Sequence, residues 1–291
     1  MIPRFLCIAV SLVLTSCIIP EPLKEHREIA RNALLTDEEV AKPYYLETDE
    51  FRMHYRKVGT PKKGVVVWVH GTPGSWDDGI RLMVDKHFVS DVEIVGIDRP
   101  GWGRSQYLDN PRIVSSFEDQ GKFISPVLRK LREENPNVPL IVVGHSWGAS
   151  LVPSIALSYP ELMDGIVVAA GGIDPELTSP RWYNRFASTW IVDRFLDERM
   201  RAANVEVYAL QDQLKERESQ WRELSVPVIA IQGAEDRLVD PRNLEFIKEN
   251  FPDPYVLMLE DQGHLLQAER IELIGRCIKA MLNQDFADCR E

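Results

Sequence analysis

The chain has 291 residues, of which 44% are hydrophobic, so it can bury a large core and does not belong to the disordered proteins. Its formal net charge of -11 and its lack of any lysine and arginine cluster exclude nucleic-acid binding, because phosphate backbones are held by clustered cations. With this negative charge we expect a small neutral or mildly cationic ligand. The four cysteines include no Cys-x-x-Cys pair and have no nearby histidine at metal-ligand spacing, so we expect no metal site.

The amino terminus has the architecture of an export signal. Arg4 precedes an apolar stretch from Phe5 to Leu14 that is too short to span a bilayer. The residues that follow, ending at Cys17, resemble the lipobox of bacterial lipoprotein signal peptides, in which the cysteine is acylated. The resemblance implies a signal peptide over residues 1–16, a membrane anchor on Cys17 and, because residue 18 is not aspartate, the outer membrane. A plain cleaved signal and an uncleaved anchor are the alternatives.

The segment after the signal is charged and begins with prolines. We expect residues 17–42 to be a lipidated tether, with a spacer followed by a short helix. Residues 44–48 and 51–59 alternate between apolar and polar and predict an antiparallel hairpin. No apolar run after residue 16 approaches twenty residues, so the mature chain is expected to have no transmembrane segment.

Short apolar runs rich in valine and isoleucine dominate the rest of the chain. Their apolarity is continuous, which is typical of strands covered on both faces in a parallel sheet. The runs are 64–70, 92–98, 139–145, 165–171, 227–233 and 255–260. Helix-length segments lie between them, at 112–134, 147–158, 241–250 and 267–282. This alternation predicts an α/β fold with a mostly parallel sheet and helices on both faces, over residues 43–173 and 225–291.

A long insertion separates the last two apolar runs from the others. Residues 174–224 are helical in pattern, and we expect them to form a small cap over the carboxyl ends of the strands, where ligands bind in open sheets. Trp182, Phe186 and Trp190 are four residues apart and fall on one helix face. They are candidates for the wall of a substrate pocket, and the alternative is that they attach the cap to the core.

The sequence Gly-His-Ser-Trp-Gly, residues 144–148, places Ser146 between a strand and a helix, as a nucleophile elbow requires. A serine needs a base and the base needs an orienting acid. His264 lies in a loop after the last strand, and Asp236 follows the strand before it. Asp240 and Asp174 are rival orienting acids.

An attacked carbonyl also needs two hydrogen-bond donors for its oxyanion. We expect one to be the backbone N–H of Trp147 and the other that of Thr72, since Pro73 has no N–H. His70 is interpreted as a residue that orients this oxyanion loop, and His145 as a packing residue.

Five motifs of the chain together resemble those of the α/β-hydrolase superfamily, specifically of its branch with a cap inserted after the sixth strand. They are HGTPGS, DRPGWGRS, GHSWG, GAEDRLVD and the GH before the final helix, and the resemblance spans roughly residues 43–283. In that family the triad follows the chain order serine, acid, histidine, as Ser146, Asp236 and His264 do here. Epoxide hydrolases and haloalkane dehalogenases carry aspartate at the elbow, so the serine disfavours both chemistries.

The leading hypothesis is a serine hydrolase that cleaves carboxylic esters through an acyl-enzyme and needs no cofactor. Lipase, haloperoxidase and carbon–carbon bond hydrolase activities are alternatives that the sequence does not exclude. An aminopeptidase of the prolyl-iminopeptidase kind would need cap carboxylates for a substrate ammonium, and Glu198, Glu206 or Glu216 could serve. A non-catalytic binding lipoprotein is the third possibility. Cys277 and Cys289 are either a disulfide or free thiols.

Overall fold

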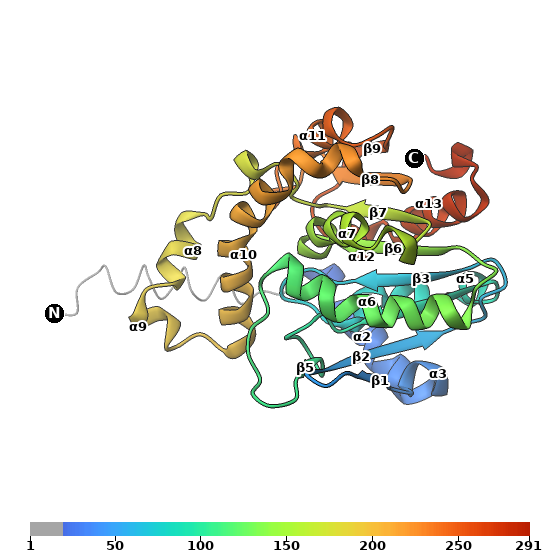
Figure 1. Cartoon of the computed structure of the whole chain (residues 1–291), viewed down its shortest axis with the longest axis horizontal. Helices are drawn as coiled ribbons and strands as arrows, with labels where there is room; N and C mark the ends of the chain where they lie inside the picture. Colours follow the sequence, from blue (N-terminus) through green and yellow to red (C-terminus); the bar gives the residue numbers. More distant parts are fainter. Residues whose placement is uncertain (1–19) are drawn as a thin grey trace.

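The computed structural model describes residues 20–291, which form a nine-stranded sheet between two layers of helices (Figure 1). The strand order is β1-β2-β4-β3-β6-β7-β8-β9, with β5 paired beside β2. The pairings of β2 with β1, β4 and β5 are antiparallel, and all others are parallel. The strands are β1 (Tyr44–Glu47), β2 (Phe51–Val58), β3 (Gly64–Val69), β4 (Val92–Ile97), β5 (Gln106–Tyr107), β6 (Leu140–His145), β7 (Gly165–Ala169), β8 (Val228–Gly233) and β9 (Tyr255–Leu259). The predicted α/β fold with a mostly parallel sheet is confirmed.

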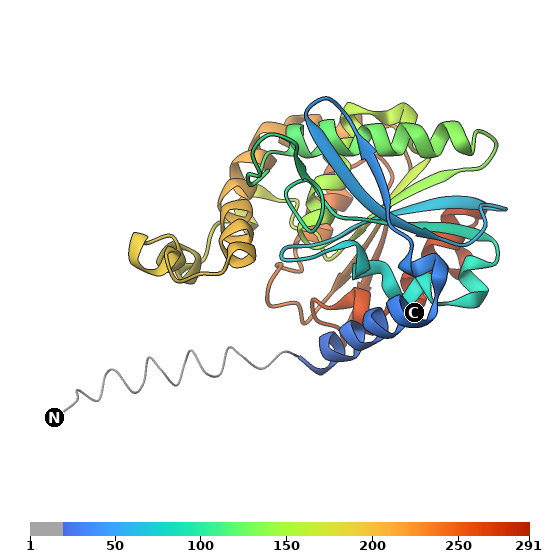
Figure 2. The same ribbon diagram turned by 90° about the horizontal axis from the view of Figure 1, so that it is seen from below.

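Helices cover both faces of the sheet (Figures 1 and 2). On one face lie α6 (Phe117–Glu134), α7 (Trp147–Ser158) and α11 (Asn243–Asn250). On the other lie α2 (Glu21–Thr36), α4 (Ile80–Met83), α5 (Lys86–Val89), α12 (Leu266–Glu269) and α13 (Ile271–Asn283). Strands β3, β4, β6, β7 and β8 are therefore buried along their whole length, which explains why their sequences are continuously apolar.

The amino-terminal segment differs from the expected spacer. Helix α2 and the short α3 (Glu38–Ala41) pack against the core. His26, Ala30 and Ala33 are buried on one stripe of α2, and His26 Nε2 lies 2.8 Å from the carbonyl oxygen of Asp77. Small side chains at helical spacing allow the close approach. A helix is present as expected, but it begins at Glu21 and is packed on the core, so residues 21–41 are not a spacer. The predicted signal peptide, residues 1–16, and Cys17 lie outside the described residues.

The expected cap segment leaves the sheet after β7 and returns at β8. It contains α8 (Trp182–Ala187), α9 (Trp190–Asp193) and α10 (Glu198–Arg217), followed by the 3-10 turn η4 (Glu218–Glu223). These helices lie beyond the carboxyl ends of the parallel strands (Figure 1). The strand before the insertion is the seventh in the structure and not the sixth, because the two-residue β5 carries no apolar run and escapes sequence analysis. The remaining 3-10 turns are η1 (Trp76–Gly79), η2 (Pro160–Leu162), η3 (Pro175–Leu177) and η5 (Phe286–Asp288).

A disulfide joins Cys277 on α13 to Cys289 near the carboxyl terminus. Tyr255 supports the same segment by donating a hydrogen bond from its hydroxyl to the carbonyl of Cys289, at 2.6 Å. The structure thus answers the question that the sequence left open for these two cysteines. Between residues 20 and 291, none of the helices has the length and apolarity needed to cross a bilayer.

Candidate active site

The turn between β6 and α7 holds Ser146 in a strained conformation. Its φ of 54° and ψ of -122° are rare for a residue with a side chain. The glycines on either side permit this turn: a Cβ at Gly144 would collide with the backbone of α7, and one at Gly148 would collide with the carbonyls that end β3. The N–H of Ser146 donates to the carbonyl of Ala169 on β7, at 2.9 Å. The turn therefore presents the serine hydroxyl above the carboxyl end of the sheet.

Ser146, His264 and Asp236 are joined in a chain of hydrogen bonds. His264 Nε2 lies 2.8 Å from Ser146 Oγ, and His264 Nδ1 lies 2.7 Å from Asp236 Oδ2. His264 comes from the loop between β9 and α12, and Asp236 from the loop after β8. An ionised Asp236 accepts from Nδ1, which leaves Nε2 of a neutral imidazole free to accept the proton of the serine.

Asp236 is held as a carboxylate by several donors. Its Oδ1 accepts hydrogen bonds from the backbone N–H groups of Leu238 and Val239, at 2.8 and 2.9 Å, and Gln232 donates to Oδ2 at 3.0 Å. Burial alone would raise the pKa of Asp236, but the bonds from His264 and from the two backbone N–H groups bring it below its ordinary value. The acid is therefore charged at neutral pH, as an orienting residue must be.

The two rival acids make other contacts. Asp240 forms an ion pair with Arg242 at 2.7 Å, and Asp174 caps a 3-10 turn by accepting from the N–H of Glu176 at 2.8 Å. Neither carboxylate is bonded to His264 within the described chain. The structure therefore brings Asp236, and not its rivals, to the imidazole.

The expected oxyanion donors lie on either side of the serine. Trp147 is the first residue of α7, where a helix has unpaired N–H groups. The loop after β3 reaches the serine through Gly71, at which a Cβ would stand 2.9 Å from Cβ of Ser146. Within residues 20–291, the backbone N–H groups of Thr72 and Trp147 have no hydrogen-bond acceptor. Two free donors thus flank the position at which an oxyanion would form.

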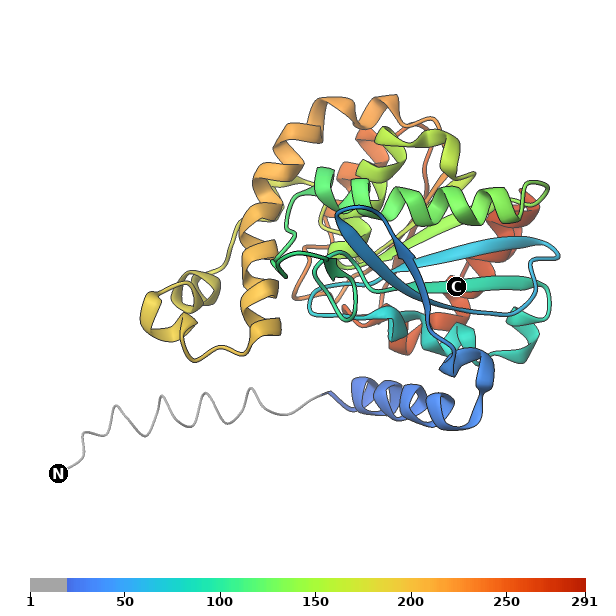
Figure 3. The same cartoon turned by 60° about the horizontal axis from the view of Figure 1, so that its bottom comes forward.

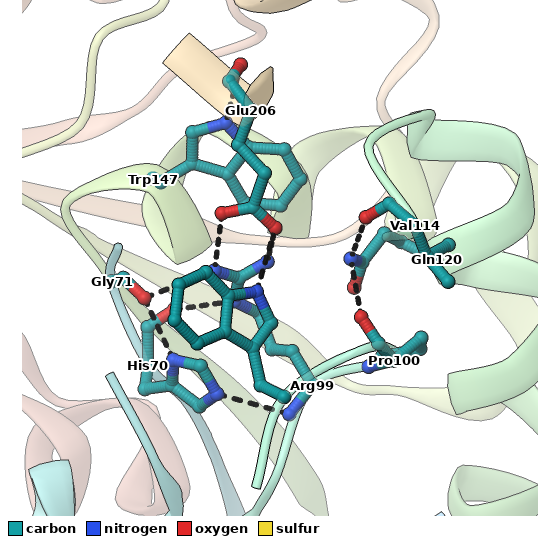
Figure 4. A network of polar contacts seen from close by, with 9 residues as sticks. His70, Gly71, Arg99, Pro100, Val114, Gln120, Trp147 and Glu206 are labelled. Carbon is teal, nitrogen blue, oxygen red and sulfur yellow. Dashed lines mark hydrogen bonds and ion pairs between the residues drawn. The ribbon is translucent and has the colours of Figure 1, made fainter. Parts of the chain in front are cut away.

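A buried arginine forms hydrogen bonds to the loop that is expected to supply one oxyanion donor (Figure 4). Arg99, in the loop after β4, donates to the carbonyl of His70 at 2.8 Å and to that of Gly71 at 3.0 Å. Its guanidinium also lies 4.2 Å from the centre of the Trp147 ring. Arg99 therefore contacts both segments that supply the expected oxyanion donors.

His70 is fixed within the same network. Its Nδ1 lies 2.7 Å from the carbonyl of Gly71, and its Nε2 accepts from the N–H of Arg99 at 3.0 Å. Complete burial and the neighbouring charge of Arg99 lower the pKa of His70 to about 3. The ring is therefore neutral, and each of its two nitrogens makes a hydrogen bond, which suits its expected role in orienting the loop.

The cap closes the network with Glu206 of α10. Its carboxylate accepts from Arg99 at 2.7 and 2.9 Å and from the indole of Trp102 at 2.8 Å, and its backbone carbonyl accepts from the indole of Trp147 at 3.3 Å. Both charged side chains are fully buried. Sequence analysis did not find Arg99, and it considered Glu206 only as a ligand for a substrate ammonium. That role conflicts with the structure, because the carboxylate is already neutralised by Arg99.

The aromatic side chains of the cap do not line the site. Trp182, Phe186 and Trp190 are 77%, 60% and 79% exposed, so the prediction that they form a pocket wall is wrong. The alternative, that they attach the cap to the core, is also wrong. Helix α8 is tied to α10 by two hydrogen bonds: Asn184 Nδ2 donates to Asn204 Oδ1 at 3.1 Å, and Asn204 Nδ2 donates to the backbone carbonyl of Asn184 at 3.3 Å. These polar contacts leave the aromatic side chains in solvent.

His145, beside the serine, has more partners than a packing residue needs. Its Nε2 lies 3.1 Å from the carbonyl of His264, and its Nδ1 lies 3.3 Å from Asp78 Oδ2. Burial alone would lower the pKa of His145, but Asp78 and the carbonyl of His264 raise it above its ordinary value. Burial alone would raise the pKa of Asp78, but the neighbouring His145 and a bond from Trp68 hold it far below its usual range. The pair supports the loop that carries His264.

Replacement of Glu206 by glutamine should leave Arg99 as an uncompensated buried cation. We expect Glu206→Gln to lower the free energy of unfolding by about 3 kcal/mol, measured by urea denaturation. Glu216→Gln, at an exposed position of the same helix, is the control and should change it by less than about 0.5 kcal/mol. Equal effects of the two variants would contradict the assigned network.

The pair of His145 and Asp78 predicts a pH dependence of stability. The pKa of His145 is raised on folding. The contribution of His145 to the free energy of unfolding is therefore fully present below its ordinary pKa of about 6.5, and it is lost as the pH rises through the raised pKa of the folded state. The difference in unfolding free energy between wild type and His145→Gln should therefore shrink from acidic to alkaline pH. His87→Gln, at an exposed position, should show no such trend. A pH-independent difference would rule out a charged His145.

Comparison with known proteins agrees with this architecture. The family model described as serine aminopeptidase, S33, matches residues 60–207. The uncharacterized hydrolase YugF of Bacillus subtilis is 22% identical, and the match covers 79% of this chain and 94% of YugF. Epoxide hydrolase 1 of Caenorhabditis elegans is 28% identical, but the match covers only 42% of this chain and 29% of that enzyme.

Solved structures show the same fold over nearly the whole chain. A membrane phospholipase A, a bacterial virulence factor, superposes with a TM-score of 0.64 at 18% identity, and the match covers 97% of this chain and 98% of the other. The family match covers the elbow, the oxyanion loop and part of the cap. The chain belongs to the serine aminopeptidase, S33, family and is a hydrolase of the α/β-hydrolase fold.

Proposed function

We propose that this hydrolase cleaves carboxylic esters with Ser146 as nucleophile, His264 as base and Asp236 as orienting acid. The observation that carries the proposal is the unbroken hydrogen-bonded chain from Asp236 through His264 to the hydroxyl of Ser146. A serine on a strained turn, with an imidazole nitrogen 2.8 Å from its hydroxyl oxygen, is the arrangement that acyl transfer needs.

The steps follow from the positions of these atoms. Ser146 Oγ attacks the ester carbonyl while His264 Nε2 takes its proton, and the N–H groups of Thr72 and Trp147 stabilise the oxyanion. The intermediate collapses to an acyl-serine and expels the alcohol, which receives the proton from His264. Water then attacks the acyl-serine, His264 again takes and returns a proton, and the carboxylic acid leaves. Asp236 remains ionised and stabilises the imidazolium at each stage.

Among the alternatives, aminopeptidase activity is suggested by the description of the family. Such an activity needs an anionic group for the substrate ammonium. Of the three cap carboxylates considered, Glu206 is bound by Arg99, and Glu198 and Glu216 are solvent-exposed. Epoxide hydrolysis is disfavoured by the serine at the elbow, and a non-catalytic role is disfavoured by the bonded triad. Because none of these three cap carboxylates is both buried and free of a cationic partner, the substrate that the site favours is an uncharged acyl compound.

Activity on acyl esters of increasing chain length and on a prolyl amide tests the proposal. We expect ester turnover, and a loss of kcat/KM on the order of 10⁴-fold or more in Ser146→Ala. Ser154→Ala, at another buried serine of α7, is the matched control and should retain activity. A fluorophosphonate should label wild type at Ser146 only.

Three outcomes would contradict the proposal. Ester turnover that survives Ser146→Ala would exclude this nucleophile. Preference for the prolyl amide would identify an aminopeptidase. Absence of fluorophosphonate labelling in folded protein would favour the non-catalytic alternative.

We further propose that the protein is exported and anchored to the outer membrane through a lipid on Cys17. The lipobox-like residues support this, and so does the disulfide between Cys277 and Cys289, since disulfides persist in oxidising compartments outside the cytosol.

Fractionation of cells that express the full chain tests the anchor. Cys17→Ser should move the protein out of the membrane fraction, whereas Cys7→Ser, within the apolar stretch, should not. Wild-type protein already in the soluble fraction would indicate a plain cleaved signal. Membrane retention of Cys17→Ser would indicate an uncleaved anchor. Either result would contradict the proposal that Cys17 carries a lipid.

A further inference from the structure

The segment from residue 181 to residue 201, here called the cap arm, exposes a group of large apolar side chains. Neither α8 nor α9 buries a single residue. Phe195 is 83% exposed and Ile191 54%, in addition to Trp182, Phe186 and Trp190 described above. The arm extends away from the sheet on the outer side of α10 (Figure 3).

Among residues 20–291, exposed tryptophan and phenylalanine side chains occur only in the arm. The other five tryptophans of the chain are buried, and none of the other phenylalanines among residues 20–291 is exposed. Contiguous exposed aromatic groups are unusual on a water-soluble surface and mark sites of interaction. The polar contacts of Asn184 with Asn204, and of Arg201 with the carbonyl of Asp193 at 2.8 Å, hold the arm without using its aromatic groups.

The arm is also cationic in a strongly acidic protein. It contains five arginines and three acidic residues, whereas the whole chain has a net charge of -11. Four of these arginines are exposed: Arg181, Arg185, Arg194 and Arg199. Tryptophan rings and arginines together suit the headgroup region of a bilayer, where amphipathic rings settle and cations meet anionic lipids.

The arm lies next to the candidate active site. Arg181 donates to the carbonyl of Leu238 at 3.0 Å, and the N–H of Leu238 donates to Asp236. The side chain of Leu238 is itself 59% exposed. The described chain begins at the end of α2 that faces the same side of the molecule as the arm (Figures 2 and 3).

From these features we infer that the cap arm docks on an anionic phospholipid surface. The exposed aromatic side chains enter the headgroup region and the arginines contact lipid phosphates, while no part of the arm crosses the bilayer. The inference does not depend on the ester chemistry, and it adds a second membrane contact to the one proposed at Cys17.

Tryptophan fluorescence tests the inference directly, because Trp182 and Trp190 are the exposed tryptophans. The full chain is mixed with vesicles of phosphatidylcholine that contain phosphatidylglycerol, with and without bromine on the acyl chains. We expect a blue shift and quenching by the brominated lipid. Vesicles of phosphatidylcholine alone should give much weaker changes. An anchor at the amino terminus alone would bind the protein to vesicles without quenching these rings.

Variants separate the arm from the rest of the surface. Each of Arg185→Gln and Arg194→Gln should weaken the quenching-detected affinity for the anionic vesicles about fivefold. Phe195→Ser should also weaken it, whereas Arg222→Gln and Leu35→Ser, at exposed positions outside the arm, should not. All five variants should unfold at the wild-type midpoint.

Three results would overturn the inference. The first is unchanged tryptophan emission in protein that has bound to vesicles. The second is equal quenching by neutral and anionic vesicles, which would remove the role of the arginines. The third is a blue shift that depends on protein concentration without vesicles, which would assign the arm to contacts between copies of the chain.

Discussion

The ion pair between Arg99 and Glu206 is the constraint on which the candidate site depends. Two charged groups that are fully removed from water are tolerated only when each is paired and its remaining donors or acceptors are satisfied. Arg99 meets this condition only when the cap helix, the loop after β4 and the oxyanion loop are all in place. The cap is thus not an independent appendage, because its position and the geometry of the oxyanion loop are set by one guanidinium.

The sequence predicted the sheet and the contacts among Ser146, His264 and Asp236, for physical reasons. Strands buried on both faces must be apolar throughout, and a serine elbow needs glycines at fixed positions beside it. Both requirements are local, so they are visible in short stretches of residues. Asp236 was favoured over two rivals by its place after β8, and the structure places that carboxylate at His264.

The parts that sequence analysis missed depend on contacts between distant segments. Arg99 and Glu206 are 107 residues apart, and either one alone resembles an ordinary solvated charge. The four-residue spacing of Trp182, Phe186 and Trp190 predicted one shared helix face, which is wrong because Trp190 begins α9 and does not lie on α8; the spacing also gives no direction for either helix. Asn184 and Asn204 join α8 to α10, and neither residue belongs to a distinctive sequence pattern. In α2 several residues are charged, so the sequence did not indicate that Ala30 and Ala33 form a buried stripe.

Packing of α2 against the sheet would limit the distance between the folded domain and the lipid anchor proposed at Cys17. A helix of 16 residues is about 24 Å long, and it is fixed to the body instead of serving as a flexible leash. If Cys17 carries the lipid, only the few residues up to Pro20 separate the membrane from the start of this rigid helix, a reach of roughly 13 Å at full extension. The catalytic domain would then have little freedom to tumble, and its working height and orientation above the bilayer would be set by the fold.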